Sequence, residues 1–162
     1  MFKKILLPTD GSPLATQAAL EGVEFAKKVG AELVSVYVMP ESPILNFDTL
    51  GPSKEEYKEL IEQAAAKAVA PIREAAKAAG IALTERSCSA VSVGKSIVST
   101  AQDAACDLIY MASRGHSGWD KVFLGSIAST VIAESPIPVL VYKVSEKQLP
   151  KNYWSYSTQV IG

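Results

Sequence analysis

Short apolar runs alternate with longer segments of helical periodicity along most of this chain. The apolar runs occupy residues 5–7, 33–39, 82–89, 108–112 and 139–142. Between them, small and apolar residues recur at the 3.6-residue spacing that marks one face of a helix. This alternation is typical of a parallel sheet covered by helices on both faces. We therefore expect an α/β fold, a three-layer sandwich in which five parallel strands alternate with four main helices.

Capping residues mark where these helices begin and end. Serine is the expected cap of the first three periodic segments, at Ser12, Ser53 and Ser92, and Ser126 is the first residue of the fourth. Pro13 suits a first helical position, and Glu56 completes a capping box with Ser53. Gly30 and Gly80 follow the first two segments and end them. Pro71 lies inside the second segment, where we expect a kink or local break and not a new element.

Length and charge limit the classes of protein that are possible. The 162 residues fit one domain, and 48% hydrophobic with 20% charged residues exclude a disordered chain. A net charge of −1 and a pI of about 5.9 lack the concentrated basic charge that nucleic-acid binding needs. The first apolar run ends at Pro8, too early for a signal peptide or a membrane span. We expect a cytoplasmic protein with neither a nucleic-acid nor a membrane partner.

Residue types that build catalytic or metal centres are sparse. His116 is the only histidine, so we expect neither a Ser-His-Asp triad nor a histidine metal cluster. Cys88 and Cys106 are far apart and neither belongs to a CxxC pair. We interpret both as buried thiols in a reducing compartment, not as a disulfide or as metal ligands. No catalytic and no metal-ligating residue is therefore predicted.

A glycine-punctuated loop separates the fourth apolar run from the last helical segment. Gly115, Gly118 and Gly125 occur in it, and Ser126 then opens the helix. Glycines let another molecule approach the main chain, and free N–H groups at a helix start carry partial positive charge, so the loop suits a phosphate. Nearby positive charge comes from Arg114, His116 and Lys121. The alternative is an ordinary connection whose glycines serve only tight turns.

This loop resembles the nucleotide loop of the universal stress protein family. The family pattern G-x2-G-x9-G-[S/T] aligns here as Ala112-x2-Gly115-x9-Gly125-Ser126, with alanine in place of the first glycine. The resemblance covers residues 1–144 and leaves 145–162 as a C-terminal extension. It implies the strand order 3-2-1-4-5, which places the ends of the first and fourth strands side by side. It also implies a homodimeric, ATP-binding regulator or sensor of stress without efficient turnover.

The resemblance carries over a set of nucleotide-binding residues. They are Pro8, Thr9, Asp10, Val38, Ala112, Ser113, Arg114, Gly115, His116, Ser117, Gly118, Gly125, Ser126, Ile127 and Ala128. Asp10 would lie against the nucleoside and Val38 would face the base. The residues alone leave two alternatives open, a turn-forming aspartate before glycine and simple core packing of the valine. The implied ligand is ATP, AMP or ADP, with Mg or Mn bound through the phosphates and no evident protein ligand for the metal.

Residues 89–96 imitate the end of a Walker A phosphate loop. Gly94, Lys95 and Ser96 match that motif, but Ser89 stands where its first glycine is required. We therefore interpret Gly94 as a position of close packing at a helix start and Lys95 as solvated.

The last strand and the C-terminal extension predict contacts with a second copy. An apolar strand at a sheet edge needs a cover, and the resemblance implies a homodimer through Val139, Leu140, Val141 and Tyr142. The extension contains Tyr153, Trp154 and Tyr156, and we expect it to pack on the domain or on the dimer partner. Two rival functions stay open, a dimeric interaction module without nucleotide, and a slow ATPase or autokinase that uses loop serines.

Overall fold

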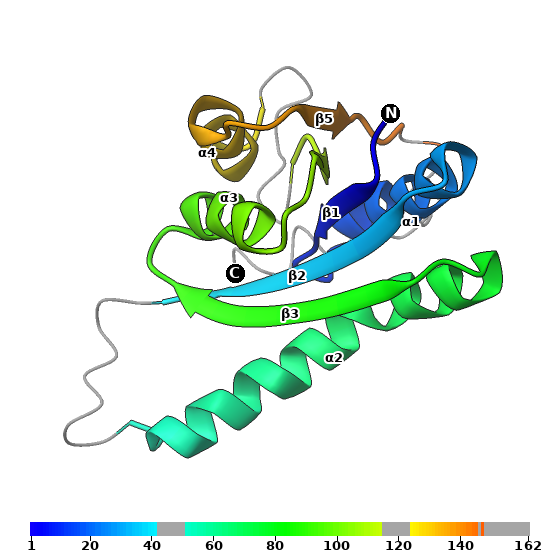
Figure 1. The fold of residues 1–162 in the computed structure, drawn as a ribbon. Coiled ribbons are helices and arrows are strands. Elements are labelled where there is room, and N and C mark those ends of the chain that lie inside the picture. Colours follow the sequence, from blue (N-terminus) through cyan, green and yellow to red (C-terminus); the bar gives the residue numbers. More distant parts are fainter. Residues whose placement is uncertain (42–50, 115–123, 146, 148–162) are drawn as a thin grey trace.

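The computed structural model describes residues 1–41, 51–114, 124–145 and 147 (Figure 1). Within them it contains five strands and four helices, as the sequence predicts. In chain order they are β1 (Lys4–Pro8), α1 (Pro13–Val29), β2 (Glu32–Pro40), α2 (Lys54–Ala79), β3 (Leu83–Ala90), α3 (Val93–Asp103), β4 (Leu108–Ala112), α4 (Ser126–Glu134) and β5 (Val139–Tyr142). None of the helices in this described part is long and apolar enough to cross a membrane.

The five strands form one parallel sheet in the order β3-β2-β1-β4-β5. This confirms the strand order implied by the family resemblance. Helices α1 and α2 cover one face of the sheet, and α3 and α4 cover the other (Figure 1). Because every strand runs in the same direction, all five end at the same edge of the sheet.

β1 lies between two hydrophobic cores, one on each face of the sheet, which explains its uninterrupted apolar sequence. Ile5 and Leu7 face the core under α1 and α2, whereas Leu6 faces the core under α3 and α4. All three side chains are completely buried. Successive side chains of a strand point to opposite faces, so a strand covered on both sides needs an apolar residue at every position.

The predicted caps set the helix boundaries. The Ser12 hydroxyl accepts a hydrogen bond from the Ala15 amide at 3.2 Å, and Ser53 with Glu56 forms the complete capping box. Helix α2 continues through Pro71 to Ala79, so Pro71 starts no new element, as expected, and the alternative of a local break is wrong. Pro71 lies on the exposed side, and the completely buried Ile72 beside it holds the helix against the sheet.

Helix α3 ends earlier than the apolar pattern predicted. By helical spacing, the inward positions of this segment are Ile97, Val98, Ala101, Ala104 and Ala105. In the structure, Ala105 is instead exposed with a left-handed φ of 53°. The chain turns here because the Cys106 amide donates to the Ala101 carbonyl oxygen at 2.8 Å. Cys106 is buried and Cys88 is half-buried; both are free thiols. Burial raises the pKa of Cys106 to about 11.

The two edges of the sheet differ in chemistry. β3 exposes Thr84, Glu85, Arg86 and Ser87. The Arg73 guanidinium of α2 binds the Glu85 carboxylate through two hydrogen bonds of 2.6 and 2.8 Å, which tie that helix to the edge strand. β5, at the other edge, is wholly apolar or aromatic, and each of its four residues is only half-buried.

Candidate functional site

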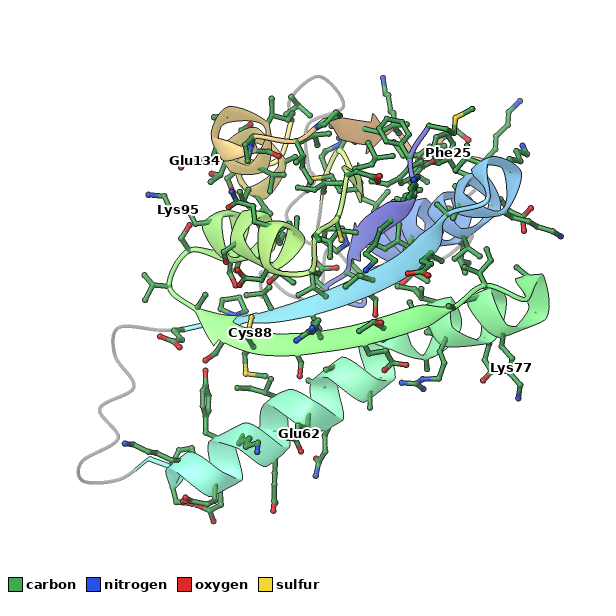
Figure 2. All side chains as sticks on the ribbon, in the orientation of Figure 1. Phe25, Glu62, Lys77, Cys88, Lys95 and Glu134 are labelled. Carbon is green, nitrogen blue, oxygen red and sulfur yellow. The ribbon has the colours of Figure 1, made fainter. Side chains whose placement is uncertain are left out.

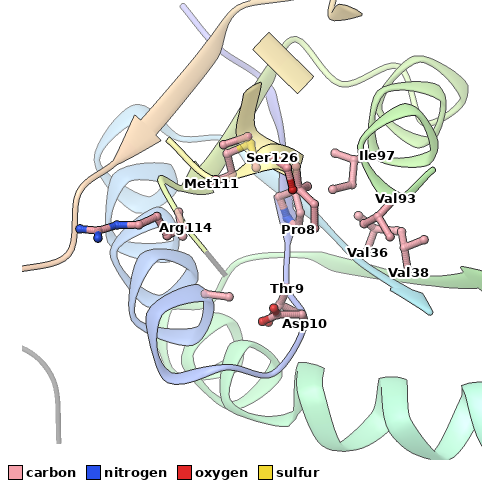
Figure 3. A pocket seen from close by; sticks show the side chains of 15 residues that line it. Pro8, Thr9, Asp10, Val36, Val38, Val93, Ile97, Met111, Arg114 and Ser126 are labelled. Atoms are coloured by element: carbon pink, nitrogen blue, oxygen red, sulfur yellow. The ribbon is translucent and has the colours of Figure 1, made fainter. Parts of the chain in front are cut away.

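A cleft opens where β1 and β4 end at the carboxyl edge of the sheet (Figure 3). It encloses about 610 Å³, the open solvent at its mouth included. Its lining residues are Pro8, Thr9, Asp10, Ala15, Val36, Val38, Val93, Ile97, Met111, Ala112, Arg114, Gly125, Ser126, Ile127 and Ala128. The chain leaves β1 and β4 toward opposite faces of the sheet, and a parallel sheet binds ligands at such a switch point.

A rigid turn after β1 forms one side of the cleft. The Thr9 amide donates to the Val36 carbonyl oxygen at 3.0 Å, which ties the turn to β2. The Gly11 amide donates to the Thr9 hydroxyl at 3.1 Å, and the Ser12 amide donates to Asp10 Oδ1 at 2.8 Å. Asp10 is therefore a turn-forming aspartate, one of the two interpretations that the sequence left open, and it also lines the cleft.

The negative charge of Asp10 affects the pKa of a nearby tyrosine, Tyr37. The pKa of the Tyr37 hydroxyl is raised, first by burial and then by the negative charge of Asp10 and by Tyr57. Tyr37 follows Val36 on β2, the strand to which the turn is bonded. The raised pKa keeps this hydroxyl protonated further into the alkaline range than an ordinary tyrosine.

The opposite side of the cleft is the start of α4. Gly125 occupies the N-cap position and has no side chain with which to cap the helix, whereas Ser12 and Ser92 cap α1 and α3. The Gly125 amide donates to the Ser113 carbonyl oxygen at 2.8 Å, which fixes this helix start beside the end of β4. The first turn of α4 thus presents a positively polarised helix end to the cleft.

One end of the cleft is apolar. Figure 3 shows Val36, Val38, Val93 and Ile97 together at this end, with Arg114 at the other end and Ser126 between them. Val38 also packs in the core under α3 and α4, and it is 6% exposed. Core packing and cleft lining therefore both apply to this valine. The cleft therefore has an apolar surface at one end, and the main-chain amides at the start of α4 lie toward the other end.

The methyl group of Ala112, which replaces the first glycine of the loop pattern, has a packing role. It belongs to a small cluster with Leu14 and Ala18 of α1 and with Val144 beyond β5. The preceding residue, Met111, faces the opposite side of the sheet, into the core under α3 and α4. The methyl group therefore packs against α1, while the apolar end of the cleft lies on the other face of the sheet.

The Walker-like segment is packed and not open. A Cβ on Gly94 would lie 2.7 Å from the Thr130 Cβ, so α3 and α4 approach too closely here for any side chain. Lys95 is exposed, and its Nζ lies 3.9 Å from Glu134 Oε1 (Figure 2). Both interpretations made from the sequence, close packing at Gly94 and a solvated Lys95, are confirmed.

The sequence model of the universal stress protein family matches residues 1–143. The chain belongs to this family. It is 32% identical over 148 residues to the universal stress protein MJ0531 of Methanocaldococcus jannaschii, covering 91% of this chain and 86% of that protein. The solved structure of MJ0577 superposes with a TM-score of 0.76 at 31% identity, covering 90% of this chain and 99% of that chain.

Two further solved structures of this family contain nucleotides. One universal stress protein was solved in complex with cAMP, and matches with a TM-score of 0.59 at 21% identity, covering 89% of this chain and 98% of that chain. A family protein from Arabidopsis thaliana was solved with AMP bound, and matches with a TM-score of 0.63 at 8% identity, covering 94% and 98%. At these identities the likeness establishes the shared fold alone.

In this universal stress protein, most of the expected site residues lie in the one cleft. Those that line it are Pro8, Thr9, Asp10, Val38, Ala112, Arg114, Gly125, Ser126, Ile127 and Ala128. Ser113 is not among the lining residues; it links the Gly125 amide to β4. Gly115, His116, Ser117 and Gly118 lie outside the described residues.

Five lining residues of this universal stress protein were not expected from the sequence. They are Ala15, Val36, Val93, Ile97 and Met111. Val36 and Met111 share a face with residues of the core under α3 and α4, so two-residue alternation at the strand ends was the available signal. In the described ranges, no group of three or more His, Cys, Asp or Glu side chains lies together that could hold a metal ion.

Proposed function

We propose that this universal stress protein binds an adenine nucleotide in the cleft and acts in the cytoplasm as a homodimeric regulator or sensor of stress, without efficient turnover. One observation carries the proposal: the side-chain-uncapped start of α4 and the Asp10 turn line the same cleft, next to an apolar wall. A nucleotide has the matching parts, an anionic phosphate and a flat, largely apolar base joined by a ribose.

The phosphates fit the start of α4. Main-chain amides of Ser126 and Ile127 lie in its first turn, where a helix has unsatisfied donors, and the Ser126 side chain adds a hydroxyl. The sequence further predicts that amides of Gly115–Gly118 contact the phosphates. ATP would then reach further toward the Arg114 end than AMP. Mg or Mn would be held through the phosphate oxygens, in keeping with the acid-poor lining.

The nucleoside fits the rest of the cleft. The base would lie against Val38, Val93 and Ile97, where its burial is favourable. Asp10 accepts the Ser12 amide through Oδ1 and is held in one orientation, which suits a carboxylate that accepts hydrogen bonds from ribose hydroxyls. Proteins of the same fold were solved with AMP and with cAMP bound, which supports an adenine nucleotide as the ligand.

Gly125 offers a sharp test of the phosphate end. Its φ of −62° and ψ of 155° suit any N-cap residue, so Gly125→Asp should fold and cap α4 with its own carboxylate. That carboxylate would occupy the helix start and repel phosphate, and we expect calorimetry to show at least about a ten-fold weaker affinity for ATP. Gly125→Asn supplies a neutral cap as the matched control and should weaken binding less. Equal affinity in all three proteins would refute the phosphate assignment.

The homodimer is proposed through the open edge of β5. The Pro138 and Tyr142 carbonyl oxygens accept bonds from the β4 side, at Ile109 and Ser113, so the main-chain groups of Val141 face outward. Val141→Pro would remove the outward N–H group and should shift the protein toward monomer in sedimentation experiments. Val141→Thr keeps that donor and should stay dimeric. A Val141→Pro protein that is folded and still dimeric would exclude this edge as the interface.

A further inference from the structure

The chain stays at the cleft edge of the sheet after its last strand. β5 is parallel to β4 and therefore ends at the edge where the cleft opens. Val144 is 9% exposed and packs with Leu14, Ala18 and Ala112. Ala112 lines the cleft. The path of the chain beyond β5 is thus anchored within one side chain of the proposed nucleotide site.

Hydrogen bonds join this anchor to the start of α4. The Ser113 amide donates to the Tyr142 carbonyl oxygen at 3.1 Å, and the Ser113 carbonyl oxygen accepts from the Gly125 amide at 2.8 Å. Gly125 is the N-cap residue of α4 and lines the cleft. Consequently, the last residue of β5 is tied through the main chain of Ser113 to the side of the cleft that is proposed to hold phosphate.

Residues 148–162 follow this anchor and are rich in aromatic side chains. The segment contains Tyr153, Trp154 and Tyr156, and Lys151 is its only charged side chain. The ten residues from Val144 to Trp154 span up to about 33 Å when extended. A domain of this size has a radius of gyration of about 15 Å, so the aromatic residues reach any part of the cleft.

We propose that the C-terminal segment 148–162 occupies the cleft when no nucleotide is bound, with an aromatic ring against the apolar wall formed by Val38, Val93 and Ile97, and that nucleotide displaces it. The proposal rests on the nucleotide site described above. A flat aromatic ring and a base bury the same wall, so the two cannot be there together. Tethering gives the segment a local concentration in the millimolar range, which makes weak intramolecular contacts effective competitors.

Removing the rings tests the competition in the full-length chain. The triple variant Tyr153→Ser, Trp154→Ser, Tyr156→Ser should bind ATP and AMP about five-fold more tightly than the parent, because the competent fraction rises when the competitor is lost. The matched control Ser155→Ala, Ser157→Ala, Thr158→Ala changes the same segment but keeps the rings, and should bind like the parent. Unchanged or weaker binding by the ring-free variant would overturn the proposal.

Trp154 provides a readout that needs no nucleotide. In a Trp119→Phe background it is the single tryptophan. We expect its fluorescence in the ligand-free protein to be blue-shifted and protected from acrylamide. Val93→Ser, in the apolar wall, should expose it, whereas Val91→Ser should not, because Val91 is 80% exposed and does not line the cleft. A Trp154 that is already water-exposed in the parent contradicts the proposal.

The outcomes separate this inference from the function it rests on. Protection of Trp154 that is lost with Val93→Ser, in a protein that binds no nucleotide, keeps the segment in the cleft but rejects both nucleotide binding and displacement by nucleotide. Nucleotide binding with a water-exposed Trp154 keeps the proposed function and rejects the segment in the cleft. Protection that survives Val93→Ser but is lost with Val141→Pro places the segment on the dimer partner and overturns its location in the cleft.

Discussion

Gly11 packs directly against Ala68, so that a Cβ on the glycine would lie 3.2 Å from the Ala68 Cβ. The contact joins the turn after β1 to α2. Asp10 belongs to the same turn, which a 2.8 Å hydrogen bond from the Ser12 amide to Asp10 Oδ1 closes. The turn that carries this cleft residue therefore packs against α2, on the face of the sheet opposite α3 and α4.

Gly11→Ala should destabilise the fold and weaken nucleotide binding together. Gly11 has a φ of +78°, where a side chain is strained by about 1–2 kcal/mol, and the contact with Ala68 adds to that cost. Gly30→Ala is the matched control, with a φ of +71° and nothing within 4 Å of the added Cβ. Urea unfolding should show a larger loss for Gly11→Ala than for Gly30→Ala. Equal losses of unfolding free energy in the two variants would mean that the contact with Ala68 accommodates the added methyl group without a further loss of stability.

Gly94→Ala should separate α3 from α4. The new Cβ would lie 2.7 Å from the Thr130 Cβ, which is close to the helix backbone and cannot swing aside. We expect a loss of about 1–3 kcal/mol in the free energy of unfolding, as for other overpacked sites. The exposed Ser99→Ala on the same helix is the control and should change stability little. A stable Gly94→Ala protein would show that the two helices can move apart freely.

Ala112→Gly should lower stability without improving nucleotide affinity. The methyl group packs with Leu14, Ala18 and Val144, so its removal costs about 1 kcal/mol of unfolding free energy. Restoring the family glycine would tighten binding only if the methyl group obstructed the nucleotide. We expect the calorimetric dissociation constants of the parent and the variant for ATP to agree within about two-fold, well short of the ten-fold change that corresponds to 1.4 kcal/mol. A marked gain in affinity would contradict the packing role.

Alkaline pH should destabilise the native protein through Cys106 and Tyr110. Burial raises the pKa of Cys106 from 9.0 to about 11, and that of Tyr110 from 10.0 to about 12. The folded state therefore holds these protons more tightly, so the stability gained is complete below pH 9 and falls as pH rises toward 12. Unfolding free energies measured from pH 8 to 11 should decline, and Cys106→Ala should decline less. A flat profile would contradict the burial effect.

The ion pair between Arg73 and Glu85 should make a small contribution that salt weakens. Hydrogen bonding from Arg73 lowers the pKa of Glu85, so the stabilisation is present above the ordinary carboxyl pKa and is lost as pH falls below it. Both side chains are more than a third exposed, which limits the effect. Glu85→Gln should lower the melting temperature slightly at low salt. Glu62→Gln is the control, since it removes a more exposed pair with Lys58.

The sequence predicted the elements of the fold because their signals are local. Serine caps and the apolar run at β1 depend on neighbouring residues alone, and the structure places them as expected. Ala105 was assigned wrongly because the chain turns there at a left-handed alanine, a position that usually marks itself with glycine. The strand order came from the family resemblance, since periodicity does not say which strands are neighbours.

The cleft was predicted less completely than the fold. Its polar side could be found from the sequence, because clustered glycines and the Thr-Asp-Gly-Ser turn after the first strand mark loops and turns. Of its apolar lining, Val38 was expected from the family resemblance, whereas Val36 and Met111 were not, since they are buried residues that look like any other core position in the sequence. Only the point at which each strand ends makes them part of a surface, and that point depends on the tertiary arrangement.

The contrast between the two sheet edges limits how far copies of this protein can associate. A pair joined along β5 would turn both β3 strands outward, and these carry Thr84, Glu85, Arg86 and Ser87. Charged side chains on an outer strand oppose further pairing with another sheet. Association would therefore stop at two copies. With no second apolar edge available, the sheets could not extend into a filament.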